Sequence, residues 1–510
     1  MGRGLSPPGA TVFVGFMGAG KSRAAREAAS VQGATAVDTD ALIEARLGHT
    51  IAEQFERGGE AAFRELEEQV VLEALESATE RSAVALGGGS VLSERVAAAL
   101  AGHTVVWIDA DVETAWARAG RKGRPLAQSQ EEFGALLRER VPVYERLADA
   151  IVPAGHMPAA RDAVATLRRA PAGTLLLWAV SASGEYPVLI GRGLLGADLW
   201  PIARPPSRRF CVTDDNVGPL YADRLGELDA RITILAGEAS KTLAEAERIW
   251  RELAQGGMAR DDHLVALGGG VVGDLAGFCA ATYQRGVAIV GCPTTLTAQV
   301  DSAYGGKTGV DLPEAKNYVG AYHQPAAVIT DTSALETLPE AEVASGYAEV
   351  LKSALIAGGE LWRRLSDDEP LDDAMVKACV RLKLSIVAED ERDAGRRAVL
   401  NLGHTVGHAI EAATGYARYR HGEAVGLGLL AALRLSGQSE LRERVGELLA
   451  AHGLPTRAEG IDEAAIVAAV ERDKKRSGGA VGFVLLDGPG EPRAGMRVAD
   501  DELRAAVAEL

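Results

Sequence analysis

The segment Thr11-Val-Phe-Val-Gly15-Phe-Met-Gly18-Ala-Gly20-Lys21-Ser22 joins an apolar strand to a glycine-rich turn, and a helical pattern begins at Lys21. Such glycines let backbone amides converge on phosphate oxygens. Lys21 places a cation near the β- and γ-phosphates of a nucleotide, and the Ser22 hydroxyl can bind Mg²⁺. Because the turn lies between a strand and a helix, we expect an α/β fold with a P-loop here. The expected ATP-binding residues are Gly18, Ala19, Gly20, Lys21, Ser22 and Arg23.

Outward from this segment, the pattern of strands and helices divides the chain into three parts. Strand-like runs at residues 83–86 and 105–108 alternate with helical stretches, which is typical of a parallel α/β unit. The sequence Ala170-Pro-Ala-Gly173 interrupts that pattern, and a second α/β pattern follows it. From about Leu335 the periodicity is almost wholly helical until Val481–Leu486. We therefore expect an α/β domain at 1–169, a larger α/β domain at 170–334 and a helical domain at 335–510.

The composition is that of a globular protein with an excess of acidic residues. The chain has 510 residues, of which 47% are hydrophobic and 25% charged, and its formal net charge is −17. This charge argues against non-specific nucleic-acid binding, so we expect no nucleic-acid partner. The cysteines show no metal-binding spacing, no segment has the features of a signal peptide, and no apolar run is long enough to span a bilayer. We therefore expect a cytoplasmic protein that does not bind membranes.

Residues that can bind a small acidic molecule follow the P-loop. Asp38-Thr-Asp40 lies where a second strand is expected to end, at the ligand-binding edge of a parallel sheet. Arg64, Arg124 and Arg140 are candidate ligands for a carboxylate or phosphate. Each arginine alone is more simply explained as a solvated surface residue, but the run Gly87-Gly-Gly89 completes a recognisable combination.

Residues 10–165 resemble shikimate kinase through the P-loop, Asp38-Thr-Asp40, Gly87-Gly-Gly89 and Arg124-Pro-Leu126. The resemblance implies that ATP phosphorylates shikimate, with Mg²⁺ held at Ser22. It implies that Asp40 is the base toward the hydroxyl that is phosphorylated, that Lys21 is also catalytic, and that Arg124 closes over the γ-phosphate. The implied shikimate-binding residues are Asp40, Arg64, Gly88 and Arg140.

Three histidines lie close together in the expected helical region, in Asn401-Leu-Gly-His404-Thr-Val-Gly-His408 and His421-Gly-Glu423. The first two are four residues apart, so both imidazoles can lie on one face of a helix. With His421 they form a candidate metal site, since neutral imidazole is a common zinc ligand. Glu349 and Lys352 are three residues apart on one helical face, where a surface ion pair is an equally simple explanation.

The second α/β region carries glycine-rich turns and charged residues. Leu267-Gly-Gly-Gly270-Val-Val-Gly-Asp274 follows a strand and precedes a helical pattern, which suits a pyrophosphate at a helix N-terminus. Thr294-Thr295 opens another such turn, Asp301-Ser-Ala-Tyr-Gly-Gly-Lys307 combines an acid and a base with glycines, and Lys316-Asn317 adds a further cation. Each segment alone can be an ordinary loop, whereas their combination indicates a binding site.

Residues 175–510 resemble 3-dehydroquinate synthase through these motifs, beginning at Gly237-Glu-Ala-Ser-Lys241. The resemblance implies a Rossmann-like NAD-binding α/β domain, then an all-helical metal-binding domain, and a homodimer formed through this half. It implies conversion of 3-deoxy-arabino-heptulosonate 7-phosphate to 3-dehydroquinate plus phosphate. The implied ligands of Zn²⁺ or Co²⁺ are Glu349, His404 and His421, so His408 leaves the set suggested by spacing and joins Lys307 and Lys352 as a catalytic residue.

The same resemblance implies two larger sets of residues. The NAD-binding set is Asp214, Asn216, Glu238, Lys241, Gly269, Gly270, Asp274, Thr294, Thr295, Lys307, Lys316 and Thr337. The sugar-phosphate-binding set is Asp301, Lys307, Asn317, Lys352, Lys383, Arg397, Asn401, His408 and Arg285, the last reaching the phosphate of a neighbouring subunit. Two positions depart from the family pattern. Asp393 replaces Glu, and Ala480-Val-Gly482 lacks a phosphate-binding basic residue, a role left open for Lys474, Lys475 or Arg476.

The sequence therefore predicts a bifunctional enzyme of aromatic biosynthesis, with the kinase before the synthase. One alternative is a related sugar-phosphate cyclase that makes another carbocycle. A second is a P-loop domain that senses nucleotides and regulates the cyclase without turnover, which the intact Lys21, Asp40 and Arg64 argue against. A third is a metal-dependent dehydrogenase of the glycerol type, which the many Lys and Arg phosphate contacts argue against.

Overall fold

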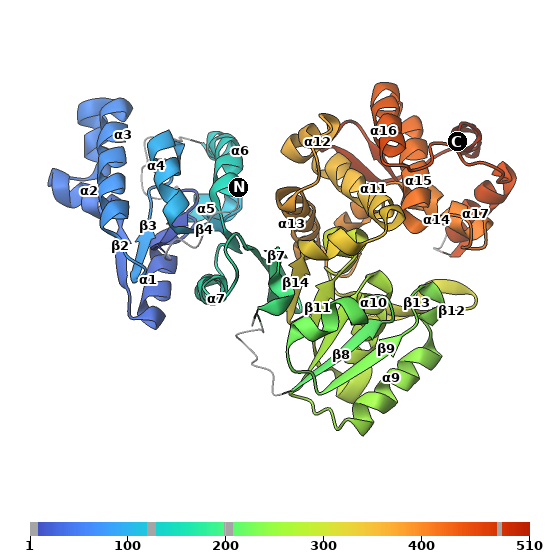
Figure 1. The fold of residues 1–510 in the computed structure, drawn as a ribbon. Helices are drawn as coiled ribbons and strands as arrows, with labels where there is room; N and C mark the ends of the chain where they lie inside the picture. Colours follow the sequence, from blue (N-terminus) through green and yellow to red (C-terminus); the bar gives the residue numbers. More distant parts are fainter. Residues whose placement is uncertain (1–8, 120–128, 198, 200–207, 477–481) are drawn as a thin grey trace. The chain divides into compact units, whose positions relative to one another are not determined.

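The computed structural model describes residues 9–119, 129–197, 199, 208–476 and 482–510 (Figure 1). The chain forms two compact units. The first comprises Met1–Ala179, Tyr186–Leu189 and Ala197–Pro205, and the second comprises Val180–Glu185, Ile190–Gly196 and Pro206–Leu510. Strands β6 (Leu175–Ser181) and β7 (Gly184–Gly191) carry the chain from the first unit to the second. The domain boundaries expected at residues 170 and 335 remain predictions.

The first unit contains a parallel sheet with the strand order β2-β3-β1-β4-β5, and β6 runs parallel to β5. The strands are β1 (Thr11–Val14), β2 (Thr35–Asp38), β3 (Ser82–Ala85), β4 (Thr104–Asp109) and β5 (Ala150–Pro153). Strand β1 is buried along its whole length, because its residues are β-branched or aromatic and suit a strand covered on both faces. The glycine-rich turn starts at the carboxyl end of this central strand, where open α/β sheets bind ligands.

The helices of the first unit are α1 (Lys21–Gln32), α2 (Thr39–Leu47), α3 (Ile51–Ser77), α4 (Glu94–Ala99), α5 (Val112–Ala119), α6 (Gln130–Leu147) and α7 (Met157–Leu167). Capping side chains just before the first helical residue fix where α2 and α3 begin. Asp38 accepts hydrogen bonds from the amides of Asp40 and Ala41 and so caps α2, while Thr50 and Glu53 form a capping box at α3. The aspartate pair expected at the end of a strand is therefore fixed at a strand-to-helix turn.

The second unit contains a parallel sheet with the order β9-β8-β10-β11-β14. Its strands are β8 (Arg209–Asp214), β9 (Ala230–Ile234), β10 (His263–Gly268), β11 (Ala288–Pro293) and β14 (Ala327–Asp331). A core that includes Phe210, Ile232, Leu264 and Leu275 fixes helices against this sheet. The chain reverses its direction of winding between β8 and β10, and such a switch point is where a doubly wound sheet binds its ligand.

The remaining elements of the second unit are helices and two β-hairpins. The helices are α8 (Gly218–Tyr221), α9 (Leu243–Gln255), α10 (Gly270–Thr282), α11 (Glu340–Ala357), α12 (Gly359–Ser366), α13 (Asp373–Glu389), α14 (His404–Ala413), α15 (His421–Leu435), α16 (Ser439–Ala451), α17 (Glu463–Arg476) and α18 (Asp500–Ala508). The hairpins are β12 (Lys307–Leu312) with β13 (Ala315–Tyr322), and β15 (Phe483–Leu486) with β16 (Pro492–Met496). Strand β15 lies where the helical periodicity was expected to end, and with β16 it shows that the domain expected to be all helical also contains strands. Within the described ranges, no helix combines the length and apolar character needed to cross a bilayer.

Candidate functional sites

The turn between β1 and α1 has the backbone of a phosphate-binding loop. Gly18 and Gly20 have φ values of 81° and 103°, a region that favours glycine. A Cβ at Gly18 would lie 2.4 Å from the carbonyl oxygen of Ala115, so no side chain fits there. The N-cap of α1 is Gly20, which has no side chain to bond the first helical amides, and a phosphate can therefore accept from them. Lys21 Nζ donates to the Phe16 carbonyl at 3.1 Å, which holds the ammonium group over the turn.

The glycine run after β3 brings charged groups next to this turn. A Cβ at Gly87 would lie 2.9 Å from Asp40 Oδ1, and a Cβ at Gly89 would lie 2.3 Å from Arg64 Nη1. Arg64 forms ion pairs with the carboxylates of Glu60 at 3.1 Å and Glu67 at 2.6 Å. The absence of side chains in the run therefore leaves room for the carboxylate of Asp40 beside Gly87 and for the guanidinium of Arg64 beside Gly89.

Helix α6 contributes a further cation to the same place. Arg140 is 4% exposed, and its Nη1 donates to the Gly88 carbonyl at 3.2 Å. The Tyr144 hydroxyl donates to the same oxygen. A Cβ at Gly88 would lie 3.1 Å from the backbone nitrogen of Met17 in the P-loop. Gly88 therefore lies against the P-loop and also accepts hydrogen bonds from α6. Arg23 is exposed on α1, and Arg124 falls outside the described residues.

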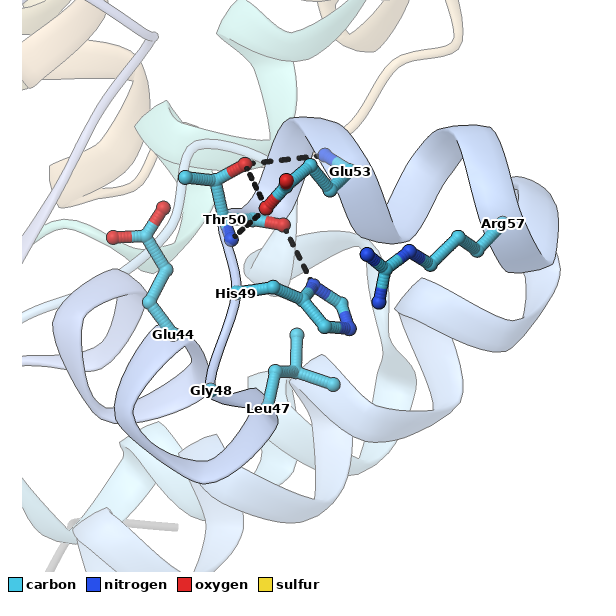
Figure 2. Close-up of a pocket in the computed structure, with 7 residues that line it drawn as sticks. All are labelled: Glu44, Leu47, Gly48, His49, Thr50, Glu53 and Arg57. Atoms are coloured by element: carbon cyan, nitrogen blue, oxygen red, sulfur yellow. Dashed lines mark hydrogen bonds between the residues drawn. The ribbon is translucent and has the colours of Figure 1, made fainter.

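A separate hollow of about 610 Å³ lies at the turn from α2 to α3 (Figure 2). Its lining comprises Glu44, Leu47, Gly48, His49, Thr50, Glu53 and Arg57. The Ile51 amide donates to Glu44 Oε1 at 3.1 Å, and the Thr50 amide donates to Glu53 Oε2 at 2.8 Å. These polar groups hold the turn in shape, and none of them belongs to the expected shikimate-binding set.

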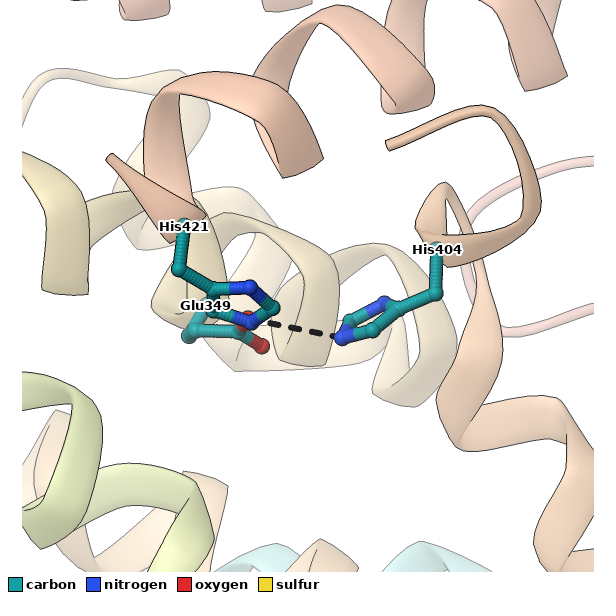
Figure 3. A group of neighbouring side chains, drawn as sticks. All are labelled: Glu349, His404 and His421. Atoms are coloured by element: carbon teal, nitrogen blue, oxygen red, sulfur yellow. Dashed lines mark ion pairs between the residues drawn. The ribbon is translucent and has the colours of Figure 1, made fainter. Parts of the chain in front are cut away.

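In the second unit, Glu349 of α11, His404 of α14 and His421 of α15 point at one another (Figure 3). Their ligand atoms all lie within 4.8 Å of one another. Glu349 Oε1 is 3.1 Å from His421 Nε2 and 3.6 Å from His404 Nε2, and the glutamate is fully buried. One carboxylate oxygen and two imidazole nitrogens are a donor set that zinc accepts, so the residues fit a divalent ion.

Glycines bring the helices that carry these ligands into close contact. A Cβ at Gly422 would lie 1.9 Å from the carbonyl oxygen of Ser345 in α11, and a Cβ at Gly428 would lie 1.9 Å from the carbonyl oxygen of Gly403. The Gly422 amide also donates a hydrogen bond to Ser345 Oγ in α11 at 3.0 Å. The backbone of α15 therefore packs directly against its neighbours beside His421.

We expect Gly422→Ala to separate α15 from α11 and to disturb the ligand set. The added methyl group cannot fit, so the free energy of unfolding should fall by about 2 kcal/mol and Zn²⁺ should bind more weakly. Chemical unfolding and a chelator competition would measure the two effects. Gly446→Ala on α16 is the control, because a Cβ there meets only Leu430 Cδ2 at 3.9 Å. Equal Zn²⁺ affinity in the two variants would contradict the prediction.

The protonation states of His404 and His421 suit the binding of a divalent ion. Burial lowers the pKa of His404 to about 3, which keeps this ring neutral. Burial also works to lower the pKa of His421, but the carboxylates of Glu349 and Glu411 outweigh it and raise the pKa to about 10. A protonated His421 therefore balances the buried carboxylate of Glu349, and the binding of a divalent ion by these residues would be coupled to the loss of a proton.

A cluster of charged side chains continues from Glu349. Lys352 Nζ is 2.6 Å from Glu349 Oε2 and 3.3 Å from Asp301 Oδ2, and Lys383 pairs with the other oxygen of Asp301. Lys352 is 1% exposed, so the three-residue spacing expected from the sequence forms a buried ion pair. Burial works to raise the pKa of Asp301, but the two ammonium groups lower it to about 2. Burial lowers the pKa of Lys383, which Asp301 only partly offsets.

We expect Asp301→Asn to leave both ammonium groups without their shared carboxylate and to reduce the free energy of unfolding near neutral pH by about 3 kcal/mol. Because the pKa of Asp301 is depressed in the folded state, its stabilisation is present above about pH 4 and is lost as the pH falls toward the folded pKa. The difference in the free energy of unfolding between wild type and variant should therefore become smaller below about pH 4. Urea unfolding across this range measures it, and a difference independent of pH would contradict the prediction.

Expected coenzyme-binding residues meet near the carboxyl ends of β8 and β10. Lys241 Nζ is 2.7 Å from Asp274 Oδ2 and 3.7 Å from Glu238 Oε1, and it donates to Asn317 Oδ1. Burial works to lower the pKa of Lys241, but the carboxylates of Asp274 and Glu238 outweigh it and the pKa is raised. Lys316 Nζ lies 3.8 Å from Glu238 Oε1, so these residues form one network.

Glycines also open the N-terminus of α10. A Cβ at Gly269 would lie 2.8 Å from Thr295 Cγ2, and a Cβ at Gly270 would lie 3.2 Å from Ser302 Oγ. The Thr294 amide donates to the Gly268 carbonyl at 3.0 Å, which joins the two turns that follow β10 and β11. The glycine-rich turn therefore presents helical amides at the switch point of the sheet, as a pyrophosphate requires.

The other expected residues occupy several segments. Asp214 Oδ1 accepts from the amides of Asn216 and Val217 at 2.9 and 2.8 Å, and the Thr337 hydroxyl lies 2.6 Å from the Tyr221 hydroxyl. These contacts position the turns after β8 and β14. A phosphate-binding role was left open for Lys474, Lys475 or Arg476. Their side chains lie outside the described structure, and so does Ala480.

The loop after α13 is tied to the glycine segment before β12. Arg397 is 3% exposed and donates to the carbonyl oxygens of Gly305 and Glu391. Lys307 pairs with Asp393, the residue that departs from the family pattern, and the shorter carboxylate still reaches it. His408 and Asn401 are exposed, and the His404 and His408 ring centres are 5.2 Å apart. Arg285 is exposed on a turn with a positive φ of 68° and joins none of these clusters within the described residues.

Sequence reasoning missed two buried carboxylates in these sites. Glu67 is 3% exposed and accepts from Ser90 Oγ at 2.9 Å as well as pairing with Arg64. Glu411 is 5% exposed and lies 3.6 Å from His421 Nδ1. Their positions, three residues after Arg64 and three after His408, place each on the helical face of an expected site residue, which is the signal that would have found them.

Models of three protein families match the chain. Residues 17–170 match shikimate kinase, residues 231–345 match 3-dehydroquinate synthase N-terminal, and residues 346–476 match 3-dehydroquinate synthase C-terminal. A 3-dehydroquinate synthase of Halorhodospira halophila is 45% identical over 331 residues, which is 62% of this chain and 93% of the relative. One from Symbiobacterium thermophilum is 43% identical over 352 residues, or 64% of this chain and 98% of the relative.

Solved structures of related cyclases share the fold. A 2-deoxy-scyllo-inosose synthase complexed with carbaglucose-6-phosphate, NAD⁺ and Co²⁺ aligns with a TM-score of 0.58 at 25% identity, over 66% of this chain and 99% of that one. A 2-epi-5-epi-valiolone synthase from Streptomyces hygroscopicus with NAD⁺ and Zn²⁺ aligns with a TM-score of 0.59 at 26% identity, over 65% and 98%. The chain belongs to the 3-dehydroquinate synthase family and carries a shikimate kinase domain before it, and is thus a bifunctional enzyme of the shikimate pathway.

Proposed function

We propose that the second unit converts 3-deoxy-arabino-heptulosonate 7-phosphate to 3-dehydroquinate at the cluster built around Glu349, His404 and His421. The observation that carries this proposal is that these three ligands meet at a point bordered by the buried Lys352–Asp301–Lys383 cluster. A metal site beside fixed cations suits a substrate with both a hydroxyl to be activated and a phosphate to be removed. The sequence identity of 45% to a 3-dehydroquinate synthase favours this substrate over those of the related cyclases, which are 25% and 26% identical.

Each group has a defined task in this proposal. When bound, the divalent ion lowers the pKa of a substrate hydroxyl and polarises the derived ketone, while NAD accepts a hydride and later returns it. Lys352 stays protonated because Glu349 and Asp301 raise its pKa against the effect of burial. It therefore offers a fixed cation to the substrate oxygens. Lys383, Arg397, Asn317, Asn401 and Lys307 complete the binding of phosphate and carboxylate.

His408 carries protons during phosphate loss. The ring is exposed and close to His404, so it can contact both the substrate and the solvent. Imidazole is a common general acid and base in enzymes, which suits proton transfer to a leaving phosphate. NAD itself is held at the switch point of the sheet by Asp214, Asn216, Glu238, Lys241, Gly269, Gly270, Asp274, Thr294, Thr295, Lys307, Lys316 and Thr337.

The first unit phosphorylates shikimate at the P-loop. Lys21 and the first amides of α1 bind the nucleotide phosphates, and Ser22 holds Mg²⁺. Asp40, whose carboxylate lies beside Gly87, removes the proton from the attacking hydroxyl. Arg64 and Arg140 bind the carboxylate of shikimate, and Arg124 closes over the γ-phosphate.

One experiment tests both activities on the full-length chain. Each half is assayed on its own substrate, before and after thorough treatment with EDTA followed by excess Mg²⁺. We expect loss of phosphate release from the heptulosonate phosphate, its recovery with Zn²⁺ or Co²⁺, and continued phosphorylation of shikimate. Phosphate release that survives chelation would refute the metal assignment, and absence of transfer from ATP to shikimate would favour a nucleotide-sensing role for the first unit.

We also propose a cytoplasmic homodimer formed through the synthase half. The resemblance to the family supports this assembly, in which the exposed Arg285 would contact the phosphate bound by a neighbouring subunit. Sedimentation of the full chain gives the oligomeric state. Arg285→Ala should raise KM for the heptulosonate phosphate without changing KM for shikimate.

A further inference from the structure

Glu411 on α14 is a buried carboxylate that the proposed reaction does not use. It follows His404 by seven residues and His408 by three, so the three side chains lie along one face of the helix. Its Oε1 is 3.6 Å from His421 Nδ1 and 3.8 Å from Lys316 Nζ. Because Glu411 is 5% exposed, its charge depends on these two partners more than on solvent.

The two nitrogens of the His421 ring face two different carboxylates. Nε2 is 3.1 Å from Glu349 Oε1, on the side of the metal ligands, whereas Nδ1 faces Glu411. A neutral imidazole carries one N–H and one lone pair, and the partner of one nitrogen decides which form is present. A neutral ring that donates its Nδ1–H to Glu411 presents the lone pair of Nε2 on the side of the metal ligands.

We infer that Glu411 is a positioning residue that holds His421 as the Nδ1–H tautomer with Nε2 turned toward the ion, an inference that rests on the proposed metal site. Nδ1 lies 3.6 Å from Glu411 Oε1, and Nε2 lies 3.1 Å from Glu349 Oε1, so the two carboxylates face opposite sides of the ring. Carboxylates behind metal-bound histidines orient the ring and raise its basicity.

Lys316 holds Glu411 from the other side. Its ammonium group lies 3.8 Å from both Glu411 Oε1 and Glu238 Oε1, and 4.4 Å from the ring centre of Tyr416. This cation keeps the carboxylate of Glu411 in place and compensates its charge. The residue that positions His421 is therefore itself anchored to the coenzyme-binding hairpin.

A second ion is the competing explanation, because ligand atoms of His408, Glu411 and His421 also lie within 4.8 Å of one another. That arrangement requires His421 to coordinate through both nitrogens at once, which costs the ring its last N–H proton. It also places an ion next to the ammonium of Lys316. The hydrogen-bonded arrangement needs neither, so the geometry favours one ion and a positioning carboxylate.

The test measures Zn²⁺ affinity by competition with a chromophoric chelator, and the absorption spectrum of the Co²⁺-loaded protein, on the full-length chain. Glu411→Gln keeps the shape of the side chain and removes its charge, so Zn²⁺ should bind about 10- to 100-fold more weakly and the Co²⁺ spectrum should change. Glu411→Asp keeps the charge and should recover part of both. Glu447→Gln on α16 is the matched control, since its side chain is 59% exposed and pairs with Arg444.

The outcomes separate this inference from the proposed function. Zn²⁺ affinity that falls in His421→Ala but is unchanged in Glu411→Gln, with an unchanged Co²⁺ spectrum, would overturn the role of Glu411 and leave the metal site intact. Unchanged affinity in His421→Ala would overturn the metal site itself. Two ions per wild-type chain, one of them lost in Glu411→Gln, would establish the second-ion alternative. Should Glu411→Gln fail to fold, wild-type affinity and spectrum in Glu411→Ala, which also removes the carboxylate, would overturn the inference.

Discussion

Glu349→Gln is expected to abolish Zn²⁺ binding at micromolar concentrations and to lower the synthase kcat about a thousandfold, with the kinase unchanged. The variant removes the only carboxylate of the ligand set, and it also leaves Lys352 without the partner that lies 2.6 Å away. Loss of the ion removes several kcal/mol of charge stabilisation, which corresponds to a rate loss of this size. Metal analysis after dialysis and phosphate release from the heptulosonate phosphate measure the two effects.

Glu340→Gln is the control for this variant, because it changes the charge of the same helix at an exposed position. It should bind Zn²⁺ like the wild type. Retention of stoichiometric Zn²⁺ by Glu349→Gln would show that the ion binds elsewhere and would contradict the proposed site.

Lys21→Ala is expected to slow phosphorylation of shikimate by about 100- to 1000-fold, while the synthase keeps its full rate. The ammonium group over the P-loop disappears, and with it the cation that stabilises charge on the transferred phosphoryl group. The helical amides at Gly20 remain, so ATP should still bind, with a smaller change in KM than in kcat. A coupled assay for ADP and a separate assay for phosphate release give the two rates.

Arg26→Ala, exposed on the same helix α1, provides the charge-matched control. Its kinase rate should equal that of the wild type. An unaltered shikimate kinase rate in Lys21→Ala would refute the P-loop assignment, and a parallel loss of synthase activity would mean that the variant had damaged the whole chain.

Sequence patterns predicted the parts of the fold whose periodicity is strong. The P-loop lies between β1 and α1 as expected, because a buried apolar strand followed by glycines leaves few alternatives. The hairpin of β12 and β13 was not predicted. Asn317, Tyr318 and Tyr322 are exposed and no residue of β13 is fully buried, so the strand lacks the run of buried apolar residues that marks the strands of the main sheet.

Site residues that share one helix could be predicted from their spacing, whereas contacts between residues of different helices were harder to predict. The spacing of Glu349 and Lys352 predicted that they share a face, but spacing does not distinguish a buried ion pair from a solvated one. Burial arises from the packing of α11 against α15, which depends on Gly422 and Ser345 in segments far apart in the sequence. The role of Glu411 was not predicted from the sequence for the same reason, since its partners come from α15 and from the hairpin that contains β13.

The direct backbone packing of α15 at Gly422 and Gly428 has a consequence for the choice of metal. The packing of the helices sets the positions of the two imidazoles and the carboxylate, and the ion that they hold does not create these positions. Zinc and cobalt ions of similar size therefore encounter the same preformed cradle, and the protein has little means of rejecting one in favour of the other. Which element fills it in the cell follows from supply and from the intrinsic order of affinities.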